Sequence, residues 1–126
     1  TKDISKTYYS SIKISADKRK LEFDLSIEFF QKLLESQNYK CALSGILIYS
    51  GKNGKNKCHS TYIEQTASLD RIDNAKGYIE GNVQWVHKNI NIMKWDIPDN
   101  DFIKICRQIV DYQDQKLAEK TLFVLC

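Results

Sequence analysis

Apolar residues recur at helical spacing in the first third of the chain, and this pattern predicts two helices. Residues 5–19 and 27–36 each place apolar side chains three to four positions apart, so that one side of each segment can face a core. Ser26 is a suitable N-cap for the second segment, and Asn38 follows its end. Residues 21–25 alternate between apolar and polar positions, which predicts a short strand between the two helices.

The middle of the chain reads as two short strands followed by a helix. Residues 67–72 and 82–86 are the strand candidates, and the glycines and Asx residues of 73–81 suit the tight turns between them. A helix is expected over residues 87–95. The order of these segments predicts a β-hairpin with a helix packed on it.

After the break at Pro98, one more helix is expected over residues 98–120, capped by Asp99 or Asn100. Its expected apolar face consists of Phe102, Ile105, Cys106, Ile109 and Val110. The apolar tail, residues 121–126, is expected to form a final strand or a docking segment. Trp85 and Trp95 are expected in the core.

Composition narrows the class of protein without identifying a partner. The 126 residues suit a single domain, 42% of them are hydrophobic, and the formal net charge is +3. No apolar run approaches the length of a membrane span, so we expect a cytoplasmic protein that does not bind membranes. The chain begins at Thr1 without a methionine, which indicates a processed or excised piece. A larger parent protein and a homodimer both stay open.

The main candidate metal-ligating and catalytic residues lie between residues 68 and 94. Asp70 would sit on the first strand of the hairpin and Asn91 on the following helix. If that helix packs across the hairpin, their side-chain oxygens can converge on one hard divalent cation and leave positions open for water and phosphate oxygens. His87 lies four residues before Asn91 and is expected on the same helix face.

These residues resemble the HNH (ββα-metal) endonuclease family, in particular its phage and bacterial branch similar to recombination endonuclease VII and the homing nickases. The resemblance is best over residues 41–94 and strongest over residues 69–94. The positions that match the family pattern are Asp70 and Asn91 as metal ligands, Gly77 in the loop, Asn82 as the middle asparagine and Lys94 as the last lysine.

The resemblance implies an α+β fold with a β-hairpin plus helix core and flanking helices. It divides a single nuclease domain, residues 1–126, into a basic helical part over 1–40, the ββα-metal core over 41–95 and a C-terminal helix over 98–120. It also implies a DNA substrate, phosphodiester hydrolysis and one divalent cation, Mg²⁺ or Mn²⁺.

Two departures from the family pattern change the expected chemistry. Arg71 stands where the family has the histidine that activates water, and an arginine stays protonated at ordinary pH. We therefore expect His87, Asp73 or a hydroxide on the metal to take over water activation, with His87 preferred and Arg71 holding the scissile phosphate. Asn82 is counted with this catalytic group.

The second departure concerns zinc. The family's paired cysteines are missing, because Ser44 stands at the second position of the first pair, and His87 and Ile90 occupy the positions of the other pair. Cys41, Cys58 and His59 have irregular spacing and no obvious fourth ligand, so a structural zinc is not expected.

The basic residues expected to contact the DNA backbone are Lys13, Lys18, Arg19, Lys20, Lys52, Lys55, Lys57 and Lys94. A purely solvated role for the cluster over residues 13–20 stays open. Two other functions also stay open: a DNA-binding module of the same fold that has lost turnover, and a small structural zinc protein.

Overall fold

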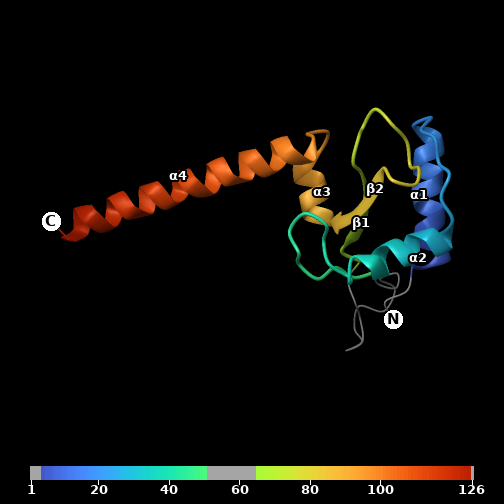
Figure 1. Cartoon of the computed structure of the whole chain (residues 1–126), viewed down its shortest axis with the longest axis horizontal. Coiled ribbons are helices and arrows are strands. Elements are labelled where there is room, and N and C mark those ends of the chain that lie inside the picture. The colour runs from blue at the N-terminus through green and yellow to red at the C-terminus, as the bar shows by residue number, and fades with distance from the viewer. Residues whose placement is uncertain (1–3, 51–64, 126) are drawn as a thin grey trace. The chain divides into compact units, whose positions relative to one another are not determined.

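The computed structural model describes residues 4–50 and 65–125 (Figure 1). Its elements in chain order are α1 (Lys6–Lys18), α2 (Ile27–Ser36), β1 (Ala67–Arg71), β2 (Val83–His87), α3 (Lys88–Lys94) and α4 (Asp99–Leu125). The chain divides into two compact units, residues 1–95 and residues 96–126. The expected α+β class, with a hairpin followed by a helix, is confirmed.

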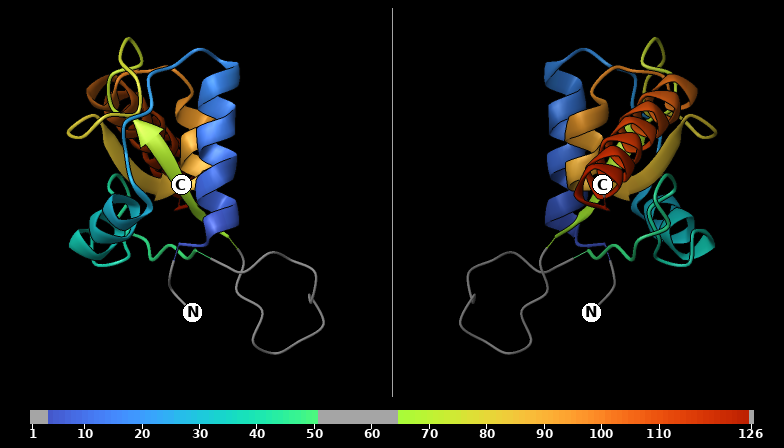
Figure 2. Two further views of the ribbon diagram at one scale, coloured as in Figure 1. Left: turned by 90° about the vertical axis from the view of Figure 1, so that its right-hand side faces the viewer. Right: turned by 90° about the vertical axis from the view of Figure 1, so that its left-hand side faces the viewer.

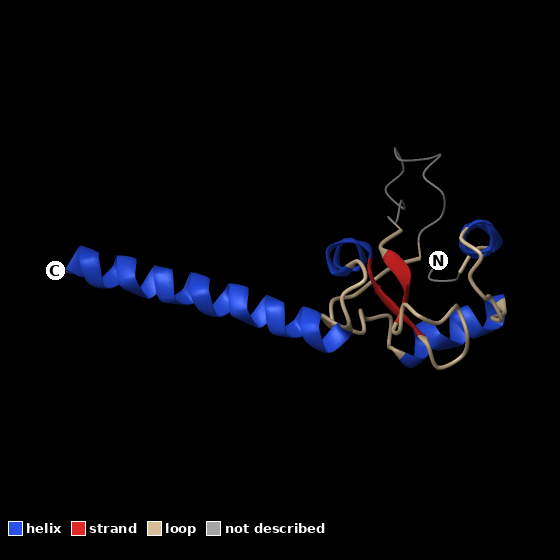
Figure 3. Cartoon of the chain, turned by 90° about the horizontal axis from the view of Figure 1, so that it is seen from above, coloured by secondary structure: helices blue, strands red, loops and turns tan. Residues whose placement is uncertain are grey.

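The antiparallel hairpin of β1 and β2 organises the first unit. Its register pairs Leu69 with Trp85 and Asp70 with Gln84. Because strand side chains alternate between faces, the hairpin has one largely apolar face and one that carries polar groups. Figure 3 shows the strands between α3 on one side and α2 on the other.

Trp85 anchors the apolar face of the hairpin. Its side chain is fully buried, its ring lies 5.5 Å from the ring of Phe30 in an edge-on arrangement, and its indole N–H donates to the Phe30 carbonyl at 3.1 Å. Burial of both rings removes a large apolar area from water while the indole donor keeps a partner. The expected core position of Trp85 is confirmed.

Helices α1 and α2 begin where serine side chains can cap them. Ser5 Oγ accepts from the Tyr8 N–H and Ser26 Oγ from the Phe29 N–H, both at 3.1 Å, which satisfies donors that have no partner inside a helix. The apolar side of α2 buries Phe30 and Leu34 completely. The predicted bounds of α2 and its N-cap are confirmed.

The strand expected over residues 21–25 is wrong. This segment makes a single parallel bridge, Phe23 to Tyr78, flanked by hydrogen bonds from the Tyr78 N–H to the Glu22 carbonyl at 2.8 Å and from the Asp24 N–H to the Tyr78 carbonyl at 2.9 Å. The bridge ties the chain after α1 to the hairpin loop. A Cβ added to Gly77 would stand 2.4 Å from the Glu22 carbonyl oxygen, so this close approach requires glycine.

The end of the first unit also differs from expectation. Trp95 follows α3 with a φ of 51° and is 81% exposed, so its expected place in the core is wrong. This positive φ lies outside the helical region and ends the helix, and the indole lies at the surface.

In the second unit, α4 covers the predicted helix and continues to Leu125, so the final strand expected over residues 121–126 is wrong. Ile109 and Val110, from its predicted apolar face, are more than half exposed, whereas Phe102 is buried. Within residues 4–50 and 65–125, no helix combines the length and apolarity that crossing a bilayer requires.

Candidate functional site

Two side-chain contacts join β1 to α3. We call the line of contact formed by Ser68, Asp70, Asn91 and Lys94 the seam. Asn91 Nδ2 donates to Ser68 Oγ at 2.7 Å, and Lys94 Nζ donates to Asp70 Oδ2 at 2.5 Å. Ser68 and Asp70 share one strand face, and Asn91 and Lys94 lie about one helical turn apart, so each strand residue meets one helix residue. The structure therefore brings Asp70 and Asn91 to the same seam, as their spacing predicts.

Asp70 is held in this seam by two donors. Besides Lys94, the amide of the cross-strand residue Gln84 donates to Asp70 Oδ2 at 2.9 Å. The Asp70 side chain is 4% exposed and that of Lys94 is fully buried. A carboxylate so far from water needs a paired cation and hydrogen bonds, and these neighbours supply both.

The expectation that Lys94 contacts DNA does not agree with the structure. Its ammonium group points inward to Asp70 and has no solvent exposure. A lysine that contacts DNA phosphates must reach the surface. The structure assigns Lys94 to the charge balance of the seam instead.

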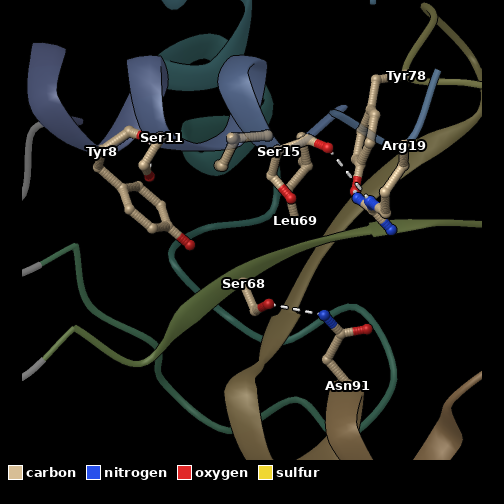
Figure 4. A pocket seen from close by; sticks show the side chains of 9 residues that line it. Tyr8, Ser11, Ser15, Arg19, Ser68, Leu69, Tyr78 and Asn91 are labelled. Carbon is tan, nitrogen blue, oxygen red and sulfur yellow. Dashed lines mark hydrogen bonds between the residues drawn. The ribbon is translucent and has the colours of Figure 1, made fainter. Parts of the chain in front are cut away.

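The side-chain amide oxygen of Asn91 is available to bind a ligand. Its amide nitrogen is used by Ser68, and Oδ1 accepts no hydrogen bond within the described part of the chain. Figure 4 shows the nitrogen turned toward Ser68 and the oxygen turned away from it. A carboxylate on the strand and an amide oxygen on the helix are hard donors of the kind that Mg²⁺ and Mn²⁺ prefer, so the residues present fit such a cation.

Arg71 does not join this seam. It follows Asp70 on β1 and so lies on the other face of the hairpin, where Nη1 donates to the carbonyls of Asn74 and Lys76, each at 2.8 Å. Its guanidinium carbon lies 5.7 Å from the centre of the Tyr78 ring. These contacts give Arg71 a part in shaping the loop, and its expected role in holding the scissile phosphate stays a prediction.

Asn82 and Asp73 also serve the loop. Asn82 Oδ1 accepts from the Asp73 N–H at 2.9 Å, and Nδ2 donates to the carbonyls of Asp73 and Gly77. Asp73 lies beyond the end of β1 and its carboxylate accepts from the Ala75 N–H at 2.9 Å. Asp73 therefore lies in the turn region expected over residues 73–81, and the structure gives both residues a part in fixing that turn.

His87 is the last residue of β2 and the N-cap of α3. Its Nδ1 accepts from the Asn89 N–H at 3.1 Å, which requires Nδ1 to be unprotonated. The register pairs His87 with Ala67, on the face of the hairpin opposite Ser68 and Asp70. The expectation that His87 shares a helix face with Asn91 is therefore wrong, since His87 precedes the helix.

Cys41 is buried beside the start of α3. Burial raises the pKa of its thiol, but hydrogen bonds from Ser44 and from backbone groups that include His87 outweigh it, so the pKa lies below the ordinary value. Cys58 and His59, the other zinc candidates, lie outside the described residues. Within the residues that are described, no group of three His, Cys, Asp or Glu side chains is arranged to hold a metal.

The basic residues of the first helical part are exposed, and one of them borders a groove. Arg19 Nη2 donates to the Tyr78 hydroxyl at 2.8 Å, while Lys13, Lys18 and Lys20 are exposed. Lys52, Lys55 and Lys57 lie outside the described residues.

The groove has a cavity volume of about 490 Å³ and runs between α1 and the seam (Figure 4). Tyr8, Ser11, Ser15 and Arg19 contribute to one wall, and Ser68 and Asn91 to the other. The sequence analysis missed the serines. Their spacing of four, on the helix side that also carries Tyr8 and Arg19, was the available signal.

Comparisons of the chain with protein-family models, curated proteins and solved structures found no match. The functional interpretation therefore depends on the chain's own residues and their geometry.

Proposed function

We propose that this chain is a DNA endonuclease or nickase domain of the HNH (ββα-metal) type, which hydrolyses phosphodiester bonds with the help of a divalent cation. The observation that carries the proposal is that Asp70, through Lys94, and Asn91, through Ser68, both take part in the contacts between one strand and one helix of a strand, loop, strand and helix. A purely structural hairpin needs neither a buried carboxylate nor an amide with a spare oxygen at its contact with the following helix.

Asp70 and Asn91 would hold the cation through their side-chain oxygens. When bound, a divalent cation stabilises negative charge on a phosphate and makes water a better nucleophile. Lys94 Nζ and the Gln84 amide both donate to Asp70 Oδ2, and together they fix the rotamer of that carboxylate.

The two described residues expected to activate water, His87 and Asp73, each accept a local backbone hydrogen bond. Because Nδ1 of His87 accepts the Asn89 N–H, the neutral imidazole carries its proton on Nε2 and presents a donor there. Asp73 is tied to the Ala75 N–H. The proposal therefore assigns His87 to capping α3 and orienting groups nearby, rather than to proton abstraction.

The experiment is a plasmid-nicking assay with MgCl₂ or MnCl₂ on the wild type, Asn91→Ala and Ser68→Ala. Both variants lose the 2.7 Å hydrogen bond between Ser68 and Asn91, but only Asn91→Ala loses the ligand oxygen. We expect Asn91→Ala to lose at least about a hundredfold in rate and Ser68→Ala to stay within about tenfold. Equal rates for the two variants would exclude Asn91 as a ligand.

The substitution Asp70→Ala is a poorer first test, because it leaves the Lys94 ammonium buried without its carboxylate. Loss of activity could then come from unfolding. Asp70→Asn also removes the charge, but it keeps an oxygen that can accept from the Lys94 ammonium, so this variant, checked for a cooperative thermal transition, is the better one at this position.

A second candidate function is DNA binding without turnover. It is favoured by the engagement of Arg71, Asp73 and His87 in loop and cap contacts, which leaves none of them poised on the seam. DNA binding in EDTA together with intact plasmid in both Mg²⁺ and Mn²⁺ would favour this candidate over the nuclease.

A further inference from the structure

We propose that the groove between α1 and the β1–α3 seam binds a phosphate group of the DNA strand. This inference rests on the proposed function, because it names the contact that would place DNA beside Asn91. The observations that carry it are the hydroxyl and guanidinium groups that line the groove and the absence of any acidic side chain among the described residues that line it.

The α1 wall of the groove follows from helix geometry. Ser11, Ser15 and Arg19 are spaced by four residues, so they lie along one side of the helix. All three are exposed, whereas Ala16 on the neighbouring side is completely buried in the core. Figure 2 shows α1 alongside the hairpin. All three residues of this exposed side are among those that line the groove.

The charge of the groove suits an anion. Arg19 contributes the guanidinium, and Lys18 lies seven residues, about two turns, after Ser11 and therefore on the same side of α1. Asp17, the acidic residue of α1, lies two residues after Ser15 and points to the opposite side. An approaching phosphate thus meets positive charge, and no carboxylate belongs to the part of the groove lining that the structure describes.

The hydrogen-bonding groups are donors that the fold leaves available. The Tyr78 hydroxyl oxygen accepts from Arg19, which leaves its O–H proton to donate. Ser15 Oγ has no partner among the described residues. The Tyr8 hydroxyl, in contrast, already donates its proton to the Ala67 carbonyl at 2.7 Å. A phosphate oxygen in the groove could accept from Arg19, Tyr78 and Ser15 together, and charge-assisted bonds of this kind are the strong ones.

Asn91 lies on the opposite wall, so a phosphate held by α1 is adjacent to the proposed ligand. The groove would thereby fix the position of the strand relative to the seam before any cation binds. Such contacts set register and orientation but carry no sequence information.

The experiment compares Ser15→Asp with the matched control Ser10→Asp by fluorescence anisotropy on a labelled DNA duplex in EDTA. Each variant adds one carboxylate to an exposed position of α1, and Ser10 is not part of the groove. We expect Ser15→Asp to weaken binding about tenfold or more and Ser10→Asp by less than about threefold. The slope of log affinity against log salt should fall by about 0.9 for Ser15→Asp if one phosphate contact is lost.

Equal losses for the two variants, with both still unfolding cooperatively, would overturn the groove as a phosphate site. This outcome is separable from failure of the nuclease proposal. A protein that never nicks plasmid but loses binding selectively in Ser15→Asp would retain the groove. A protein that nicks plasmid while Ser15→Asp and Ser10→Asp bind alike would retain the nuclease alone.

Discussion

Lys94 Nζ lies 2.5 Å from Asp70 Oδ2, in an ion pair whose side chains are 0% and 4% exposed. The pair joins α3 to β1. It also places the positive charge of Lys94 beside the carboxylate that we propose as a ligand of the cation. Its energetics therefore connect folding with the metal binding that we propose. A buried pair adds little compared with an apolar replacement of both partners, but removal of one partner is costly.

The first prediction concerns stability. Lys94→Met leaves the Asp70 carboxylate buried without a cation, so the free energy of unfolding should fall by about 3–5 kcal/mol. Lys32→Met, at an exposed position of α2, should change it by no more than about 0.5 kcal/mol. Urea unfolding monitored by circular dichroism gives both values. A change under 1 kcal/mol in Lys94→Met, about the level of a surface pair, would contradict the buried pairing.

The second prediction uses the same variant to detect the cation. Without Lys94, a divalent cation should become the main counter-charge for Asp70, so millimolar MgCl₂ should raise the melting temperature of Lys94→Met more than that of the wild type. The added stabilisation reaches about 2.7 kcal/mol when free Mg²⁺ is a hundredfold above its Kd. The double variant Asp70→Asn with Lys94→Met should not respond. Equal responses of wild type and Lys94→Met would show that lysine and Mg²⁺ do not compete.

The third prediction concerns the contact between the hairpin loop and the segment after α1. Gly77→Ala would drive a Cβ into the Glu22 backbone, with its oxygen at 2.4 Å and its nitrogen at 2.9 Å, so the bridge between Phe23 and Tyr78 must open. Gly81 has a φ of 86° but open space around it, so Gly81→Ala should cost only about 1 kcal/mol. Gly77→Ala should therefore lower the free energy of unfolding by more than Gly81→Ala does. The reverse order would contradict the close approach at Glu22.

The fourth prediction concerns alkaline pH. Burial, with a smaller effect of Tyr78, raises the pKa of Tyr8 to about 12 from 10.0. Because the folded state holds this proton more tightly than the unfolded state, the stabilisation is complete below pH 10 and is lost as the pH rises from 10 to 12. The loss amounts to about 2–3 kcal/mol.

Tyr8→Phe should remove this part of the pH dependence. Tyr112→Phe, which alters a tyrosine that is 58% exposed, should leave it unchanged. Chemical unfolding between pH 9 and about 12 measures the difference. The same alkaline loss in all three proteins would show that Tyr8 is not responsible.

Local signals account for the parts of the fold that could be predicted. The serine cap and one-sided apolar pattern of α2 are contained within its own sequence, and its bounds were predicted correctly. The two strands were predicted to within one residue at each end. The strand predicted over residues 21–25 is wrong because the alternation of apolar and polar residues does not reveal what the segment pairs with. Its partner is Tyr78 in the hairpin loop rather than a strand.

The sequence predicts which residues of the candidate site are correctly spaced to come near one another. It does not predict which groups those side chains contact. The separation of Asp70 and Asn91 indicated a strand and a helix that could meet, and the seam agrees with it. The inward turn of Lys94 depends on which side of α3 packs on the hairpin, which spacing alone leaves open. The loop roles of Arg71 and the cap role of His87 depend on backbone groups that come near only after the chain has folded.

The contrasting positions of the two tryptophans give the protein a built-in optical reporter. Trp85 is completely buried against Phe30, whereas Trp95 is 81% exposed at the end of α3. Iodide in solution should quench the emission of Trp95 and leave that of Trp85 until the hairpin unfolds. A Trp95→Phe protein would then report the opening of the hairpin core through a single indole, without an attached dye.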